Sequence, residues 1–217
     1  MSFVTYHELA HLVLGHVKAI PTCFPDHQHN CQLLELIDID TELTPKFDSG
    51  LRQIWEFEAD LLAAIMVTAD MLSDENREFV LEALGRDKNA SLSDAEAISF
   101  TLTAIGGLFL LENQHVNHQH THPLPAIRFW AVASEIVNHM QQHYPDRIGP
   151  VDSFHQLIDQ TLESIINAWE TLHLSGATLS QYQSPQEALA AVSLLDSTRK
   201  QRCHAYKDYA LKYPMSV

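Results

Sequence analysis

Two histidines four positions apart stand near the start of the chain, in the stretch HELAH at residues 7–11. Residues i and i+4 of an α-helix lie on one face, so His7 and His11 can direct their imidazole nitrogens at a single metal ion. Glu8 directly follows the first histidine and is placed to take a proton from a water held by that metal. This pattern is typical of zinc hydrolases, in which the zinc keeps three protein ligands and one open position. It predicts that a third ligand comes from elsewhere in the chain.

A second pair of residues with helical spacing offers that ligand. Glu56 and Asp60 stand four positions apart in WEFEADLLAA, and apolar residues follow them directly. A carboxylate on an apolar face has to be paired or bound to a metal, because burying an isolated charge is very costly. We therefore predict that Glu56 is the third ligand and that Asp60 is hydrogen-bonded to a ligand histidine. Glu58 falls off that face and is predicted to be solvated.

Together these motifs resemble those of the gluzincin metallopeptidases, in particular the Ste/HtpX-type proteases, whose pattern is HExxHxxxxH followed by ExxxD. The chain has HELAHLVLGH, then EFEAD, and later THPLPAIRFWAV, which is similar to a downstream family segment with a histidine and an arginine. The resemblance implies a zinc ion on His7, His11 and Glu56. It also implies that His122 and Arg128 line the site and help to stabilise the tetrahedral intermediate.

The chain differs from that family in its surroundings. The family's membrane spans have no counterpart, which favours a soluble member, similar to the phage-exclusion Lit-like peptidases. The family also places a sheet before its first motif, whereas only six residues precede His7. Residues 33–43 would replace that sheet, or the sequence begins too late, or the chain is a degenerate or regulated relative. His16 ends the longer motif, and we expect it to support the structure or a ligand histidine rather than to bind the metal.

The expected activity is peptide-bond hydrolysis by a zinc metalloendopeptidase. A metal-activated water would attack the carbonyl, with Glu8 as the general base that later protonates the leaving amine. The tetrahedral intermediate would be held by the metal together with His122, and Arg128 would orient or charge the pocket. The alternative is a catalytically inactive, zinc-stabilised helical domain that serves binding or scaffolding. Glu8 argues against it, because a purely structural site has no use for a general base.

Two other groups of possible ligands are present. The first is a run of cysteines and histidines: Cys23, His27, His29 and Cys31. Its cramped spacing differs from that of paired zinc motifs, so a polar loop is the competing interpretation. The second is a histidine-dense loop that leads to His122: His115, His118 and His120. We interpret it as a solvated loop, with a gating or adventitious metal-binding role as the alternative. The tryptophans stand in apolar helical contexts and are expected in the core or the pocket wall: Trp55, Trp130 and Trp169.

Helices must position these side chains, because apolar residues recur with a helical period along most of the chain. The expected helices cover residues 4–20, 50–72, 73–85, 91–113, 125–143 and 152–174, with one or two more in 184–213. Pro21 is expected to end the first helix. The most apolar stretch, residues 97–111, is too short to span a bilayer and is interpreted as a buried helix. The fold is thus predicted to be mainly α, a zincin-like helical core with at most a small β element.

Length and composition limit the remaining possibilities. The 217 residues are expected to form a single domain, with the active-site core in 1–143 and C-terminal helices in 144–217. The formal charge of −15 argues against a nucleic-acid partner, because phosphate contacts require a basic face. Three cysteines without disulfide spacing, and the lack of a leader pattern, predict a cytoplasmic location. The expected partner is a protein or peptide substrate, with no membrane span, and the oligomeric state is left open.

Overall fold

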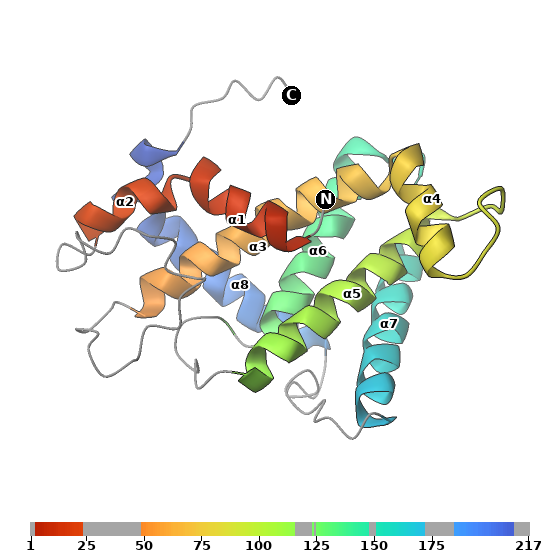
Figure 1. The fold of residues 1–217 in the computed structure, drawn as a ribbon. Coiled ribbons are helices and arrows are strands. Elements are labelled where there is room, and N and C mark those ends of the chain that lie inside the picture. The colour runs from red at the N-terminus through yellow and green to blue at the C-terminus, as the bar shows by residue number, and fades with distance from the viewer. Residues whose placement is uncertain are drawn as a thin grey trace.

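The computed structural model describes residues 3–23, 49–115, 123, 125–147, 151–171 and 185–210. All regular structure within these ranges is helical, which confirms the mainly α fold class (Figure 1). The strand considered for residues 33–43 lies outside them. The elements are α1 (Phe3–Val13), α2 (His16–Cys23), α3 (Ser49–Met71), α4 (Asp74–Ala83), α5 (Asp94–His115), α6 (Pro125–His143), α7 (Val151–Thr171), α8 (Pro185–Arg202) and the 3-10 turns η3 (Cys203–Ala205) and η4 (Lys207–Tyr209).

Helix α3 is the element against which the site is built. Helix α1 packs along it, and α6 packs against it as well (Figure 1). Helix α5 packs on α6 and α7, while α8 packs on α6 and also touches α3. The two motif-bearing helices are therefore direct neighbours, and the C-terminal helix reaches the same central element.

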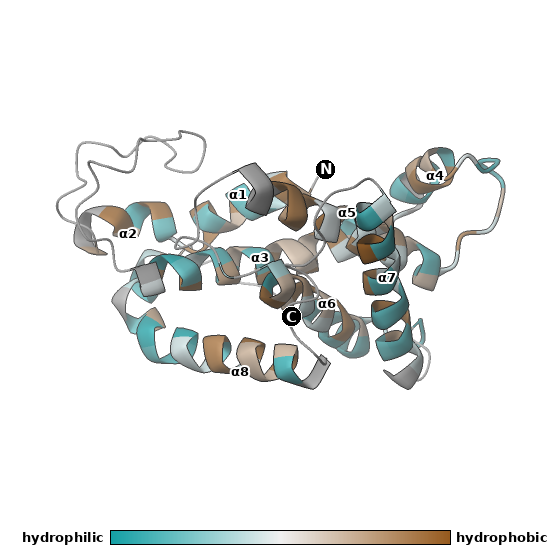
Figure 2. Cartoon of the chain, turned by 90° about the horizontal axis from the view of Figure 1, so that it is seen from below, coloured by the Kyte–Doolittle hydropathy of each residue, from teal (hydrophilic) through white to brown (hydrophobic). Residues whose placement is uncertain are grey.

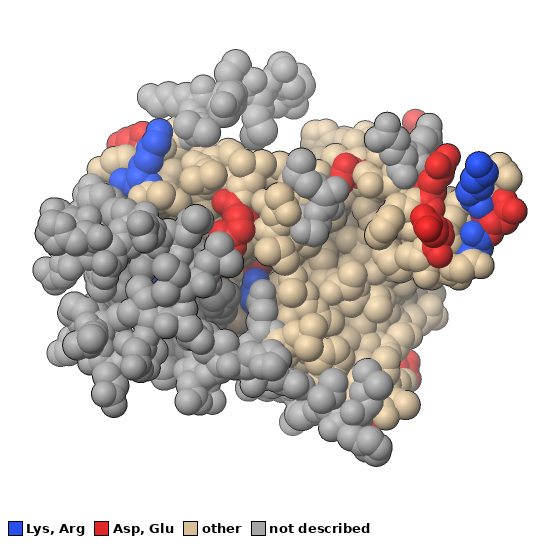
Figure 3. All heavy atoms as spheres, viewed as in Figure 1, with Lys and Arg blue, Asp and Glu red and all other residues tan. Residues whose placement is uncertain are grey.

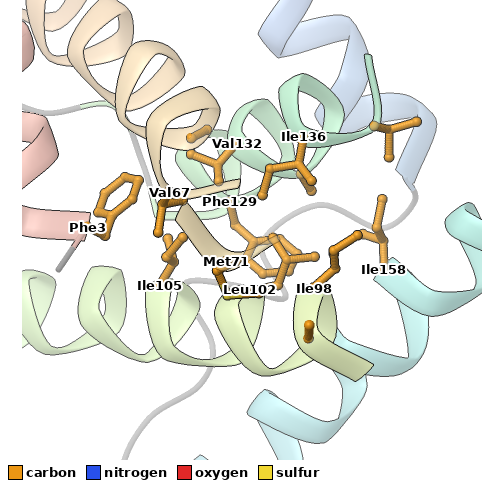
Figure 4. Close-up of a cluster of buried hydrophobic side chains, with 14 of the residues drawn as sticks. Phe3, Val67, Met71, Ile98, Leu102, Ile105, Phe129, Val132, Ile136 and Ile158 are labelled. Atoms are coloured by element: carbon orange, nitrogen blue, oxygen red, sulfur yellow. The ribbon is translucent and has the colours of Figure 1, made fainter. Parts of the chain in front are cut away.

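The main apolar core lies between α3, α5, α6 and α7 (Figure 4). Leu102, Phe129 and Ile136 are almost completely buried there. Along α7, Phe154 and Ile158 are buried on one face, and Figure 2 shows polar residues alternating with the apolar ones on that helix. Burying one such large side chain contributes about 1.5–3 kcal/mol. This core holds α3 and α6 in place with ordinary hydrophobic packing.

A second, smaller apolar cluster joins three segments that are far apart in the sequence. It contains Ala19 and Ile20 of α2, Ile54 and Trp55 near the start of α3, and Tyr206 between the two C-terminal turns. The C-terminal segment is therefore packed onto the helices that carry the histidine and carboxylate motifs.

The helix expected over residues 4–20 is interrupted, and this part of the prediction was wrong. Gly15 has a φ of +80°, a left-handed conformation that glycine adopts at little cost. An added Cβ would lie 2.3 Å from the backbone carbonyl carbon of Tyr209, so no side chain fits there. Helix α2 then runs past Pro21 to Cys23. The interruption changes the direction of the chain immediately before His16.

Helix α5 begins with a reciprocal pair of hydrogen bonds between Ser93 and Glu96. The Ser93 hydroxyl accepts a hydrogen bond from the Glu96 amide, and the Glu96 carboxylate accepts one from the Ser93 amide.

The stretch Asp94–Leu111 of α5 is long and apolar enough to cross a membrane by length and composition alone, and 44% of it is buried in the structure. The face with Leu102 is buried as expected, whereas Leu111 is exposed.

Candidate metal centre

The two motifs meet across the packed pair α1 and α3. The Nε2 atom of His7 lies 3.2 Å from Glu56 Oε2 and 3.2 Å from His11 Nε2. His11 Nε2 lies 3.7 Å from the same Glu56 oxygen. The three ligand atoms fall within 4.8 Å of one another, and all three residues are buried. Among the described residues, this group has the geometry to hold a metal ion, as the i, i+4 spacing predicted.

Asp60 and Arg128 hold the Nδ1 side of the His7 ring, opposite the candidate ligand atom Nε2. Asp60 Oδ1 accepts a hydrogen bond from His7 Nδ1 at 3.0 Å, which is the contact expected between Asp60 and a ligand histidine. Arg128 donates to both Asp60 oxygens, from Nε at 2.7 Å and from Nη2 at 3.0 Å. Burial would raise the pKa of Asp60, but Arg128 and His7 hold it below its ordinary value. Asp60 is therefore an ionised acceptor that directs the His7 ring.

His16 and Glu58 secure His11 in a similar way. The Nδ1 atoms of His11 and His16 lie 2.9 Å apart, and His16 Nε2 lies 3.0 Å from Glu58 Oε2. The same Glu58 oxygen accepts a hydrogen bond of 2.7 Å from the Tyr206 hydroxyl. The prediction that Glu58 is solvated was wrong: its exposed fraction is 8%. Residues 56 and 58 point to different sides of α3, and the C-terminal segment covers the second side.

The hydrogen-bond partners assign the tautomers of the three histidines. Burial lowers the pKa of His16 despite the opposing effect of Glu58, so the ring is neutral and carries one N–H. That N–H donates from Nε2 to Glu58, which leaves His16 Nδ1 to accept from His11 Nδ1. His7 Nδ1 donates to Asp60. In its neutral form, each of the two ligand histidines therefore carries its lone pair on Nε2, which faces the same point as Glu56.

This convergence of acceptors requires a positive charge at its centre. Without a metal, a proton takes that place: burial lowers the pKa of His7, but its bonds to Asp60 and Glu56 raise it to about 10. A divalent metal ion satisfies all three acceptors together, whereas one proton bridges only two of them. Two neutral imidazoles and one carboxylate also match the ligand set of catalytic zinc sites. The residues present thus fit the metal that the sequence predicts.

Of the three remaining predicted site residues, the structure describes Glu8 and Arg128 but not His122. Glu8 lies beside His7 on α1 and is partly exposed. Arg128 is buried at 4% exposure, with its guanidinium 4.0 Å from the Phe109 ring, and it bonds Asp60 behind the ligands. His122 lies outside the described residues, so its predicted role stays a prediction. Sequence reasoning missed Glu58 and Tyr206 because no local spacing relates them.

The other possible ligand groups are covered only in part. Cys23 is half-buried at the end of α2, and its suggested partners lie outside the described residues: His27, His29 and Cys31. His115 ends α5, while His118 and His120 also lie outside them. The tryptophans pack in the apolar clusters as expected, with Trp55 and Trp130 buried and Trp169 partly buried against the main core.

Comparison of the chain with protein-family models, with curated proteins and with solved structures finds no match. The resemblance to gluzincin peptidases therefore rests on the three sequence motifs. The candidate metal centre rests on geometry: two imidazole nitrogens and a carboxylate that could hold a metal ion converge in a buried position.

Proposed function

We propose that the chain is a zinc-dependent metalloendopeptidase of the gluzincin type. The observation that carries the proposal is the convergence of His7 Nε2, His11 Nε2 and Glu56 Oε2 within 4.8 Å. Structural zinc sites normally have four protein ligands, whereas catalytic ones have three and keep a position open for water or substrate. Three candidate ligands among the described residues, with an acid directly beside one of them in the sequence, favour the catalytic class.

The residues of the chain divide the chemistry between them. A zinc ion in this site would polarise a peptide carbonyl and make an attacking water more acidic. Glu8 would accept the proton of that water on its carboxylate and pass it to the nitrogen of the leaving amine. Unlike the buried ligands, Glu8 is partly exposed, as a group that meets a substrate has to be. Proton transfer of this kind contributes roughly 10²–10⁴-fold to the rate.

Arg128 contributes through Asp60. Its two hydrogen bonds hold the Asp60 carboxylate, which in turn orients His7. We infer that Arg128 also adds positive charge behind the pocket, where the oxygen of a tetrahedral intermediate becomes negative. The resemblance assigns direct contact with that oxygen to His122. On the face that Figure 3 shows, most of the described residues are neither basic nor acidic, so the described residues there form no broad basic patch for a polyanion.

The test compares zinc content with hydrolysis of fluorescently labelled casein by the full chain. We expect about one zinc per wild-type chain and measurable cleavage that a chelator abolishes. Glu8→Gln should keep the zinc and lose at least 100-fold in cleavage rate. Glu78→Gln, an exposed change on α4, is the matched control and should leave both unchanged. Equal cleavage by Glu8→Gln and the wild type would contradict the proposed general base.

An inactive zinc-stabilised domain is the second candidate. One observation favours it. The hydrogen bonds to the candidate ligands connect α1, α3, α6 and the C-terminal turns, so a bound metal ion would stabilise contacts between several elements. That function predicts zinc-dependent folding without cleavage of casein by the wild type. The same experiment therefore separates the two candidates.

A further inference from the structure

We propose that Tyr206, Glu58 and His16 are positioning residues of the metal centre, so that docking of the C-terminal segment 203–210 raises its affinity for metal. The inference rests on the metal-binding part of the proposed function and is independent of peptide hydrolysis. It extends the site to a segment that no motif includes.

A continuous line of buried hydrogen bonds connects the C-terminal segment with His11. It runs from the Tyr206 hydroxyl to Glu58 at 2.7 Å, from Glu58 to His16 at 3.0 Å and from His16 to His11 at 2.9 Å. Glu58 accepts from both Tyr206 and His16 Nε2, so His16 Nδ1 is the acceptor for His11 Nδ1, and the lone pair of neutral His11 lies on Nε2. Tyr206 is 3% exposed and its pKa is raised by burial and by Glu58, so the phenol remains a donor.

Two aromatic rings hold the His16 imidazole in one orientation. The Trp55 ring stacks on it with centroids 5.0 Å apart and an interplanar angle of 4°. The Tyr206 ring meets it edge-on at 5.4 Å and 79°. On an uninterrupted helix, His16 would point about 140° away from His11. The turn at Gly15 and these two rings bring it back against His11.

The C-terminal segment packs closely on this part of the fold. The backbone of Tyr209 approaches Gly15 so closely that an added Cβ would lie 2.3 Å from its carbonyl carbon. Tyr206 also packs in the apolar cluster with Ile54 and Trp55. Arg199 of α8 lies 3.7 Å from the other Glu58 oxygen. The segment thus supplies a hydrogen-bond donor and apolar contacts around the buried Glu58 carboxylate, and α8 supplies a nearby positive charge.

Thermodynamic linkage gives the consequence of this arrangement. If docking of residues 203–210 favours the metal-binding tautomer of His11, then metal binding must favour docking by the same factor. The reporter amides are already defined, because Tyr206 N–H donates to Cys203 O and Tyr209 N–H donates to Tyr206 O in the docked segment. A metal ion bound at His11 should therefore slow hydrogen exchange at these two amides.

The experiment measures Zn²⁺ affinity of the full chain by competition with a chromophoric chelator, and hydrogen exchange with and without Zn²⁺. Tyr206→Phe keeps the ring contacts and removes only the donor; we expect affinity to fall on the order of threefold to tenfold. His16→Phe keeps an aromatic ring but removes the hydrogen bonds to both His11 and Glu58. We expect its Zn²⁺ affinity to fall about 10–100-fold, the range typical of residues that orient metal ligands. Tyr144→Phe removes a phenol outside the site and is the control. Far-UV circular dichroism checks that each variant is folded.

The visible absorption of bound Co²⁺ reports the geometry of the metal ligands. It would not change if Tyr206 and His16 only stabilised the fold. We expect the visible absorption of Co²⁺ in Tyr206→Phe and His16→Phe to differ from that of the wild type, because the His11 ring is less well oriented. We also expect Zn²⁺ to slow exchange in 203–210 in the wild type and not in His16→Phe. If Tyr206→Phe matches Tyr144→Phe in affinity and spectrum, or if Zn²⁺ leaves that exchange unchanged, the inference is overturned.

The outcomes separate this inference from the proposed function. Zinc binding that is coupled to the segment, without cleavage of casein, refutes the peptidase and supports the inference. Cleavage and zinc binding without coupling refute the inference alone. A wild-type chain that binds no Zn²⁺ refutes both.

Discussion

Arg128 donates two hydrogen bonds to Asp60, from Nε to Oδ2 at 2.7 Å and from Nη2 to Oδ1 at 3.0 Å. Asp60 has an exposed fraction of 0% and Arg128 one of 4%, so neither charge is screened by water. The same Asp60 Oδ1 accepts from His7. A single carboxylate thus connects the positive charge on α6 to the ligand histidine on α1.

Removing this arginine should therefore cost far more than removing a similar one at the surface. In Arg128→Met, Asp60 remains buried without its main partner, and we expect a loss of about 3–5 kcal/mol in unfolding free energy. Arg147→Met is the matched control, because Arg147 also bonds both oxygens of an aspartate, Asp94, but is more exposed. Arg147→Met should lose less than about 1 kcal/mol of unfolding free energy. Urea denaturation measures both, and similar losses would show that burial does not set the strength of the Asp60 pair.

Zinc content should depend on Glu56 specifically. Glu56→Ala removes the only carboxylate oxygen that lies within reach of both His7 Nε2 and His11 Nε2 among the described residues. We expect near-complete loss of zinc from the purified chain, measured by mass spectrometry of the metal. Glu163→Ala, an exposed change on α7, is the control and should retain the metal. Unchanged zinc in Glu56→Ala would place the metal at other histidines.

Metal binding should release a proton. The pKa of His7 is raised from 6.5 to about 10 in the metal-free protein, so at pH 7 its ring is protonated and a metal must displace that proton. We expect about one proton released per zinc near pH 7, and an apparent affinity that rises up to about tenfold per pH unit until pH approaches 10. Calorimetric titrations in buffers of different ionisation enthalpy count the proton. Binding that is independent of buffer and of pH would contradict the assigned state of His7.

The same raised pKa predicts how the stability of the metal-free protein changes with pH. A group whose pKa is higher in the folded state stabilises it fully below the unfolded value, and this contribution is lost as pH rises through the folded value. Metal-free wild type should therefore lose stability between about pH 7 and pH 10, whereas His7→Gln should lose less over that interval. Thermal unfolding in the presence of a chelator tests this comparison, and parallel curves for the two proteins would contradict it.

Two glycines in left-handed conformations should respond differently to alanine. Gly15 and Gly85 have φ values of +80° and +66°, so alanine is strained at both. At Gly85 an added Cβ meets nothing within 4 Å, and a cost of roughly 1–2 kcal/mol is expected from the backbone alone. At Gly15 the Cβ would collide with the backbone of Tyr209, so Gly15→Ala should cost clearly more. Urea denaturation gives both values, and equal costs would mean that the C-terminal segment moves aside easily.

Much of the metal centre was predictable because its parts are local patterns. The pairs His7 with His11 and Glu56 with Asp60 each have i, i+4 spacing, which places both members on one helix face wherever the helix lies. The requirement that a carboxylate among apolar residues be paired or metal-bound then joined the two pairs. The helix over residues 125–143 was also predicted at its observed bounds, because Pro125 starts it and its apolar period is regular.

Other parts were not predictable, because they depend on which surfaces are covered. Glu58 stands two positions from Glu56, so helical geometry turns it to another side of α3, and nothing nearby in the sequence indicates that this side is buried. Its partner Tyr206 is 148 positions away. The interruption at Gly15 is likewise set by the close approach of Tyr209, a contact that sequence periodicity does not contain.

The sequence by itself determined the types of ligand, their helical spacing and the mainly α class, because these follow from local periodicity and from the chemistry of single side chains. Only the tertiary structure decided which nitrogen of each histidine is left for a metal. That choice depends on Asp60 behind His7 and on His16 with Glu58 behind His11. The contacts are made between helices packed across the fold, and the directions of their hydrogen bonds exist only once those helices are in place.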